Sequence, residues 1–184
     1  MSPPNVSYII IGSRERLSKI KSYQIEDGTE CILCPFSSLA DLPAILDATI
    51  AALDSKVISL IPVGAFPRKI GRSQLFYFAR SECQFWGWYH FGNKFKGALQ
   101  SIGKINTFLN KVPQIEQGIF FSKSLYFSVG GIGEIHSNPF AELAKRFYLR
   151  LDPQNPLPSL TIRGKSLLTQ FYAINYCKQS WIFH

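Results

Sequence analysis

The sequence contains few cysteines and histidines, the residues on which disulfide scaffolds and most metal centres are built. Its 184 residues include four cysteines and three histidines. Four cysteines are too few for a disulfide-stapled scaffold, and the spacing Cys31-Ile-Leu-Cys34 lacks the two further ligands that a zinc site requires. We therefore interpret Cys31 and Cys34 as structural thiols that behave like small apolar side chains, and we predict neither a metal nor a cofactor.

Acidic side chains are also scarce, which limits the chemistry available for catalysis. The chain holds 12 Asp and Glu against 20 Lys and Arg, and beyond residue 67 the acids stand singly, without the paired carboxylates of an acid–base site. The catalytic candidates are His90 and His136, either of which forms a metal-free, nuclease-like site if a lysine such as Lys94 and a tyrosine such as Tyr89 lie beside it. No spacing in the sequence requires such a site, so we expect a binding protein rather than an enzyme.

Long apolar runs are absent too. The longest apolar region, 42–66, is interrupted by Asp47, Asp54 and Lys56, so it is unlike the ~20 apolar residues of a membrane-spanning helix. The N-terminus has no basic segment ahead of its short apolar stretch, which is unlike a secretory signal. We therefore expect an intracellular protein with no transmembrane segment, in a compartment that the sequence does not specify.

What the sequence does contain is enough apolar material for one folded domain. Hydrophobic residues make up 46% of the chain and charged residues 17%, a balance too apolar for a disordered chain. The length suits a single domain over residues 1–184. Two parts of it differ in charge, because residues 1–67 carry a net −2 whereas residues 68–184 carry +10 and 22 of the 26 aromatic residues.

The pattern of apolar residues predicts a mixed α/β or α+β fold. Residues 30–62 fit one β-α-β unit, with a helix over 39–53 between two strands, and such units place their strands parallel. An aromatic-rich hairpin is predicted next, from strands at 74–79 and 84–91. Three helices are predicted beyond it, at 93–111, 138–151 and 165–177. Short strands are predicted at 8–11, 21–25 and 160–162, and one strand or a pair of strands at 119–129. The helix at 138–151 has the clearest start signal, because Asn138 suits the N-cap and Pro139 the first helical position.

A glycine-rich segment, Gly130-Gly-Ile-Gly133, follows a predicted strand and precedes the helix that starts at Asn138. Backbone amides in such a loop and at a helix N-terminus bind phosphates, and His136 lies between the two. The segment matches no standard phosphate-binding motif. It supports an alternative function, an enzyme that acts on a phosphate or nucleotide substrate through residues 130–136.

Cations and aromatic rings occur together most densely between residues 68 and 96. Because alternate residues of a strand face the same side, Phe76 shares a side with Phe78, and Trp86 with Trp88. Exposed pairs of this kind stack on bases, and neighbouring cations neutralise phosphates. We therefore expect RNA or single-stranded nucleic acid to bind within residues 68–111, through Arg68, Lys69, Arg72, Phe76, Phe78, Arg80, Trp86, Trp88, Lys94 and Lys96.

Two other interpretations of the same region stay open. Large aromatic side chains dominate hydrophobic cores, so these rings are equally suited to fill the core. A basic surface rich in Trp, Tyr and Arg also suits docking on an acidic protein partner or on a membrane surface. The solvent exposure of Phe76, Phe78, Trp86 and Trp88 distinguishes a contact surface from a core.

Overall fold

A five-stranded mixed sheet forms the centre of the protein in a computed structural model, which describes residues 5–20, 26–90, 112–114, 117–135 and 138–162. Its strands lie in the order β2-β1-β3-β6-β5. They are β1 (Val6–Gly12), β2 (Thr29–Pro35), β3 (Val57–Pro62), β5 (Trp86–Trp88) and β6 (Ile119–Ser122). A second, two-stranded sheet pairs β4 (Ala65–Phe66) with β7 (Thr161–Ile162). The mixed α and β fold predicted from the sequence is confirmed.

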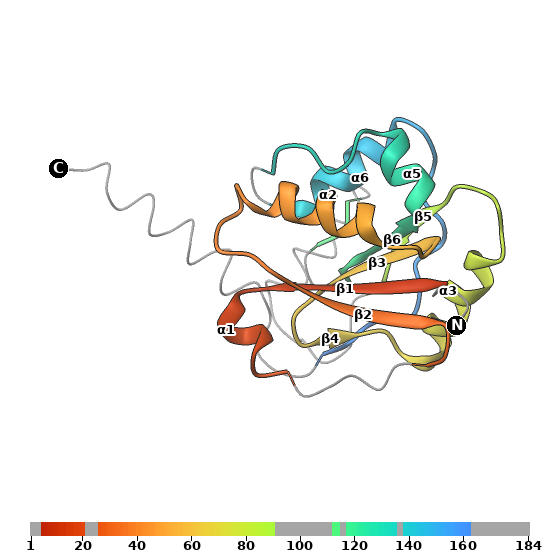
Figure 1. Cartoon of the computed structure of the whole chain (residues 1–184). Helices are drawn as coiled ribbons and strands as arrows, with labels where there is room; N and C mark the ends of the chain where they lie inside the picture. Colours follow the sequence, from red (N-terminus) through yellow and green to blue (C-terminus); the bar gives the residue numbers. More distant parts are fainter. Residues whose placement is uncertain (1–4, 21–25, 91–111, 115–116, 136–137, 163–184) are drawn as a thin grey trace, which may run out of the picture.

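Helices cover both faces of the sheet. The described residues form α1 (Arg14–Leu17), α2 (Leu42–Ala52), α3 (Lys69–Ala79), α5 (Lys123–Ser128) and α6 (Pro139–Tyr148). In Figure 1, α2, α5 and α6 lie together on one side of the sheet. On the other side, Phe78 of α3 stacks on Phe120, whereas Phe147 of α6 packs on Phe121. Because neighbouring residues of a strand face opposite sides, α3 and α6 cover opposite faces.

The β-α-β unit forms as predicted, with one strand inserted into it. β2 and β3 are both parallel to β1, which lies between them and aligns Val6 with Thr29 on one side and with Val57 on the other. All seven residues of β1 are buried. A continuous apolar run is what a strand needs when both faces of its sheet are covered.

Two helix starts show how far local signals reach. α6 begins where predicted, since the Asn138 side chain accepts a hydrogen bond of 3.0 Å from the amide two residues on and Pro139 occupies the first turn. α2 begins at Leu42, with Asp41 as its N-cap residue, three residues after the start of the helix predicted over 39–53. Both helices therefore start within a few residues of their sequence signals.

The prediction of a strand at 74–79, the first of the aromatic hairpin, is wrong, because this part of the chain belongs to helix α3. Only the second strand forms, as β5, and it pairs with β6. The helix buries Gly71, Leu75 and Ala79, whose spacing of four residues places them on one helical face. Packing of that face against the sheet outweighs the strand preference of the aromatic run within the helix.

The strand predicted at 119–129 is shorter than expected. β6 ends at Ser122, whose hydroxyl accepts a hydrogen bond from the Leu125 amide at 3.4 Å and so starts α5. Three other predicted elements lie outside the described residues. They are the strand at 21–25 and the helices at 93–111 and 165–177.

The outer edge of β5 is closed by the proline-rich segment that follows α6. The backbone amides of Gln154 and Leu157 donate to the carbonyls of Trp86 and Trp88 at 2.7 and 2.9 Å. This pairing fixes Gln154 beside β5, close to the end of α3.

Candidate functional site

Trp86 and Trp88, two of the rings expected to stack on bases, lie in the core. Trp86 is fully buried and Trp88 is 8% exposed. They share one face of the sheet, as expected, but α6 covers it: Trp86 packs on Phe147, and its indole N–H donates to the Leu151 carbonyl at 2.8 Å. The expectation that these two rings contact bases is therefore corrected, because both are core residues.

Phe76 and Phe78 do not form the shared platform that a strand would give. Two residues apart on a helix, they point about 200° away from each other. Both are half-buried, and Phe78 stacks on Phe85 and Phe120 with ring centroids 4.9 and 6.0 Å apart. The exposed ring of α3 is instead Tyr77, which is 74% exposed and was not among the residues expected to bind.

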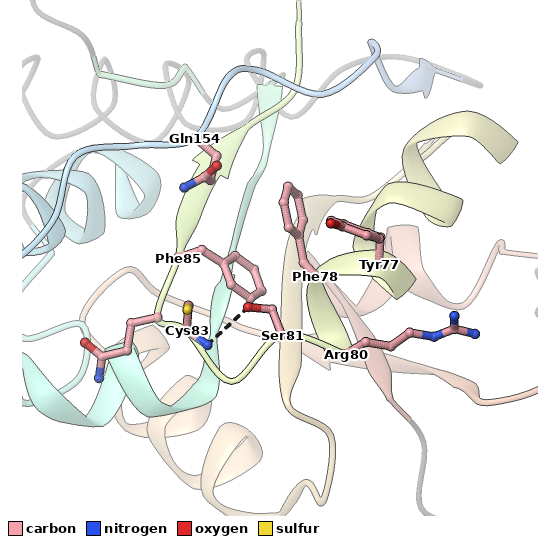
Figure 2. A pocket seen from close by; sticks show the side chains of 8 residues that line it. Tyr77, Phe78, Arg80, Ser81, Cys83, Phe85 and Gln154 are labelled. Atoms are coloured by element: carbon pink, nitrogen blue, oxygen red, sulfur yellow. Dashed lines mark hydrogen bonds between the residues drawn. The ribbon is translucent and has the colours of Figure 1, made fainter.

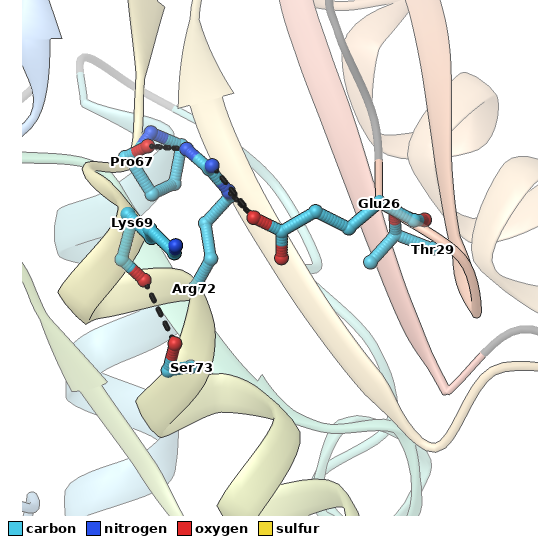
Figure 3. Close-up of polar contacts among 6 residues, drawn as sticks. All are labelled: Glu26, Thr29, Pro67, Lys69, Arg72 and Ser73. Carbon is cyan, nitrogen blue, oxygen red and sulfur yellow. Dashed lines mark hydrogen bonds and ion pairs between the residues drawn. The ribbon is translucent and has the colours of Figure 1, made fainter.

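Arg72 is committed to an internal ion pair. Figure 3 shows its guanidinium directed at the Glu26 carboxylate, with Nη2 2.8 Å and Nε 3.3 Å from the same oxygen, Oε1. Nη1 donates to the Pro67 carbonyl at 2.9 Å, and the group lies 5.8 Å from the centre of the Phe66 ring. Because these donors are engaged, Arg72 is not the phosphate contact that the sequence suggested.

Three other cations of the basic part stabilise helix ends. The Lys123 ammonium group contacts the last carbonyls of α2. The guanidinium groups of Arg146 and Arg150 donate to carbonyls at the end of α5. Cations are favoured there because the final carbonyls of a helix have no partner within it and carry partial negative charge. Part of the positive excess therefore serves the fold rather than a partner.

Arg68, Lys69 and Arg80 differ from these cations. They stand at the N-cap, the first residue and the C-cap of α3, and all three are exposed. Within the described part of the chain, their side chains make no ion pair. Tyr77 and Ile70 lie on the same side of the helix, within about 100° of Lys69. We call these five residues, Arg68, Lys69, Ile70, Tyr77 and Arg80, the α3 surface.

A partly open cavity of about 320 Å³ adjoins the α3 surface at the C-terminal end of the helix. Tyr77 and Arg80 belong to both. Figure 2 shows the Phe78 and Phe85 rings next to one another, with Tyr77 beyond Phe78, Gln154 on the opposite side, and the Arg80 side chain extending away from the rings. The cavity is lined by Tyr77, Phe78, Arg80, Ser81, Cys83, Gln84, Phe85 and Gln154.

His90 is exposed, but the tyrosine expected to assist it is not available. The Tyr89 hydroxyl is buried 2.7 Å from the Ser59 hydroxyl, and burial raises the pKa of Tyr89 well above its ordinary value. A buried phenol with a raised pKa is a poor acid near neutral pH. The other residues expected to contribute, Lys94, Lys96 and His136, lie outside the described residues.

The glycine-rich loop at 130–133 packs against the protein's own side chains. Its glycines have positive φ. A Cβ atom on Gly131 would lie 2.7 Å from the Asp47 carboxylate, and one on Gly133 would overlap the Arg146 guanidinium. A carboxylate beside the loop repels a phosphate. The described part of the loop is therefore in contact with one acidic and one basic side chain of the protein itself, Asp47 and Arg146.

Cys31 and Cys34 lie on opposite faces of β2, as three-residue spacing in a strand requires. Cys31 aligns with Tyr8 and Cys34 with Ile11 of β1. Burial raises the pKa of each thiol to about 11. Thiols that face apart and are mostly protonated at neutral pH do not form a redox pair.

No cluster of three or more His, Cys, Asp or Glu that would hold a metal occurs among the described residues. None of the described helices combines the length and the apolar character needed to cross a membrane.

Comparisons with protein-family models and with curated protein sequences find no match for this chain.

Sequence reasoning found the cations of this site and missed its exposed ring and one of its amide side chains. Arg68, Lys69 and Arg80 were expected to bind, whereas Tyr77 and Gln154 were not. A signal for the exposure of Tyr77 was present, since the spacing of Gly71, Leu75 and Ala79 predicts a helix whose other side is exposed. Gln154 carries no local signal, because it reaches the cavity only through pairing of its backbone with β5.

Proposed function

We propose that the protein binds RNA or single-stranded DNA through the α3 surface. The observation that supports this most directly is a set of exposed cations, Arg68, Lys69 and Arg80, that have no acidic partner among the described residues, beside the 74% exposed ring of Tyr77. Cations neutralise phosphates and aromatic rings stack on bases, and binding to single strands combines both.

The spacing of the cations suits several phosphates rather than one. Lys69 and Arg80 are separated by 11 residues, so they lie about 16 Å apart along the helix axis. The helix contains no acidic residue that would repel a phosphate. At its N-terminal end, the positive end of the helix dipole also favours a phosphate. An exposed acid, Glu82, follows Arg80 by two residues, so we expect Arg80 to contribute less than Lys69.

The test is a titration of fluorescently labelled single-stranded RNA and DNA with the full chain, at salt concentrations between about 50 and 200 mM. The logarithm of the affinity should fall linearly with the logarithm of the salt concentration. Lys69→Ala should reduce that slope by roughly 0.7, the counterion release of one contact to a single strand, and Arg80→Ala should reduce it by less.

Arg14→Ala is the matched control for this experiment. Arg14 is also exposed, and its substitution by alanine removes one positive charge. It belongs to α1, which lies at the opposite end of the molecule from α3 (Figure 1). Its slope should equal that of the wild type. A chain that binds neither nucleic acid at low salt does not have the proposed function.

The exposure of Ile70 favours a second candidate, docking of the α3 surface on an acidic protein partner. Ile70 is 67% exposed beside the cations, and an apolar side chain among cations suits a protein interface better than a phosphate backbone. Ile70→Ala separates the two functions, since it should weaken a protein complex while leaving the salt dependence of oligonucleotide binding unchanged.

A further inference from the structure

The cavity at the end of α3 has one aromatic wall. The Phe78 and Phe85 rings stack with an angle of 29° between their planes, and Tyr77 approaches Phe78 edge-on with centroids 6.3 Å apart. Phe85 is only 4% exposed, whereas Phe78 is half-buried and Tyr77 largely exposed. Ring surface without a protein partner therefore borders the cavity.

Two of the residues that line the cavity carry amide groups. The side chains of Gln84 and Gln154 are exposed, and their amides make no hydrogen bond within the parts of the chain described. The position of Gln154 is set by the 2.7 Å bond from its backbone amide to the Trp86 carbonyl. A carboxamide offers donors and an acceptor side by side, the arrangement that pairs with the edge of a nucleobase.

We infer that this cavity holds one unpaired nucleobase, stacked on the exposed Tyr77 ring, bordered by Phe78 and hydrogen-bonded along its edge by Gln154. The inference rests on the proposed function and specifies where that function reads a base. A volume of about 320 Å³ is at the small end of the roughly 300–1,000 Å³ of ligand pockets and is large enough for a single base. Arg80 extends away from the rings (Figure 2), and the sugar and phosphate of the bound nucleotide leave the cavity on that side, toward the α3 surface.

The test compares two single-stranded oligonucleotides of equal length and charge, one with adenine at every position and one abasic. The wild type should bind the adenine strand roughly 5- to 150-fold more tightly, the range for a base stacked on an aromatic side chain. The salt dependence should be the same for both strands, because their phosphates are equal in number.

Cys83 is an exposed residue of the cavity. Its substitution distinguishes binding of a base in the cavity from binding of phosphates on the α3 surface. Cys83→Trp fills the cavity with an indole ring, so the ratio of the two affinities should fall close to one while the salt slope stays unchanged. Cys83→Ser is the matched control and should keep the wild-type ratio. A wild-type ratio in Cys83→Trp would show that the base is bound elsewhere.

The outcomes keep the two proposals distinct. If the adenine and abasic strands bind the wild type equally, the base cavity is wrong and the α3 surface stands. If neither strand binds at low salt, the proposed function fails, and the cavity is tested alone by the rate at which iodoacetamide alkylates Cys83 in the presence of adenosine monophosphate. Slower alkylation in the wild type but not in Gln154→Ala supports the cavity, and an unchanged rate overturns it.

Cys83 is a suitable residue for that measurement. It is exposed, whereas Cys31 and Cys34 are partly or fully buried and burial raises their pKa to about 11, so both should react slowly. Cys177 lies outside the described residues, and Cys177→Ser removes its contribution.

Discussion

Arg72 and Glu26 form a partly buried ion pair, with Nη2 2.8 Å from Oε1, that ties α3 to the segment before β2. The two residues are 46 positions apart in the sequence. Their side chains are 18% and 38% exposed, so water screens the pair only in part. A cation in the middle of a basic helix thus stabilises the fold, while its neighbours at the helix ends stay exposed.

Arg72→Ala should lower the free energy of unfolding by about 1–2 kcal/mol, because it removes the hydrogen bonds of the guanidinium group to Glu26 and Pro67. The loss is no larger because the Glu26 carboxylate is partly exposed to water. Urea unfolding measures this loss as a lower midpoint with an unchanged m value. Glu26→Gln, which keeps an acceptor, should lose less. The salt slope of oligonucleotide binding should stay at its wild-type value, and a reduced slope with an unchanged midpoint would contradict the structural role.

Tyr77→Ala should weaken binding of an adenine oligonucleotide roughly 5- to 150-fold through loss of stacking, with little effect on stability because the ring is exposed. Tyr77→Phe keeps the ring and should bind like the wild type. Leu149→Ala is the control for removal of an exposed apolar side chain, since Leu149 is 84% exposed on a different part of the surface. Equal affinities for Tyr77→Ala and Leu149→Ala would exclude a stacking role, and fluorescence anisotropy provides the measurement.

Gly131→Ala should destabilise the protein more than Gly130→Ala. Both glycines have positive φ, so each substitution costs about 1–2 kcal/mol in backbone conformation. No atom lies within 4 Å of a Cβ on Gly130, whereas a Cβ on Gly131 would lie 2.7 Å from Asp47, which adds roughly 1–3 kcal/mol of overpacking. Thermal or urea unfolding of the two variants isolates this contact, and equal losses would mean that the loop shifts freely away from Asp47.

The thiols of Cys31 and Cys34 should make the protein less stable in alkaline solution. Burial raises the pKa of each from 9.0 to about 11. A group whose pKa is higher in the folded state stabilises that state fully below its unfolded pKa, and the contribution is lost as the pH rises toward the folded value. The free energy of unfolding, measured under reducing conditions, should therefore fall between about pH 9 and 11.

Cys31→Ala should flatten this alkaline decline, because it removes one of the two thiols whose pKa burial raises to about 11. Cys83→Ala, which removes the exposed thiol, should decline like the wild type. A decline in Cys31→Ala as steep as that of the wild type would show that Cys31 does not contribute.

Local signals were sufficient for elements whose start or period lies within a few residues. Asn138 and Pro139 locate α6, and the alternation of strand, helix and strand over 30–62 specifies the parallel core of the sheet. Composition likewise located the basic, aromatic part of the chain after residue 67. Each of these features depends on neighbours in sequence, through capping, periodicity or charge.

Which rings and cations face solvent depends instead on contacts between distant segments. Trp86 is buried because α6 lies over it, Arg72 is engaged because Glu26 reaches it, and Gln154 enters the cavity because its backbone pairs with β5. The aromatic run of α3 fits both a strand and a helical face, and packing against the sheet selects the helix. The spacing of apolar residues in the sequence does not specify which distant segments come into contact. The burial and pairing of these side chains are therefore decided by the tertiary structure.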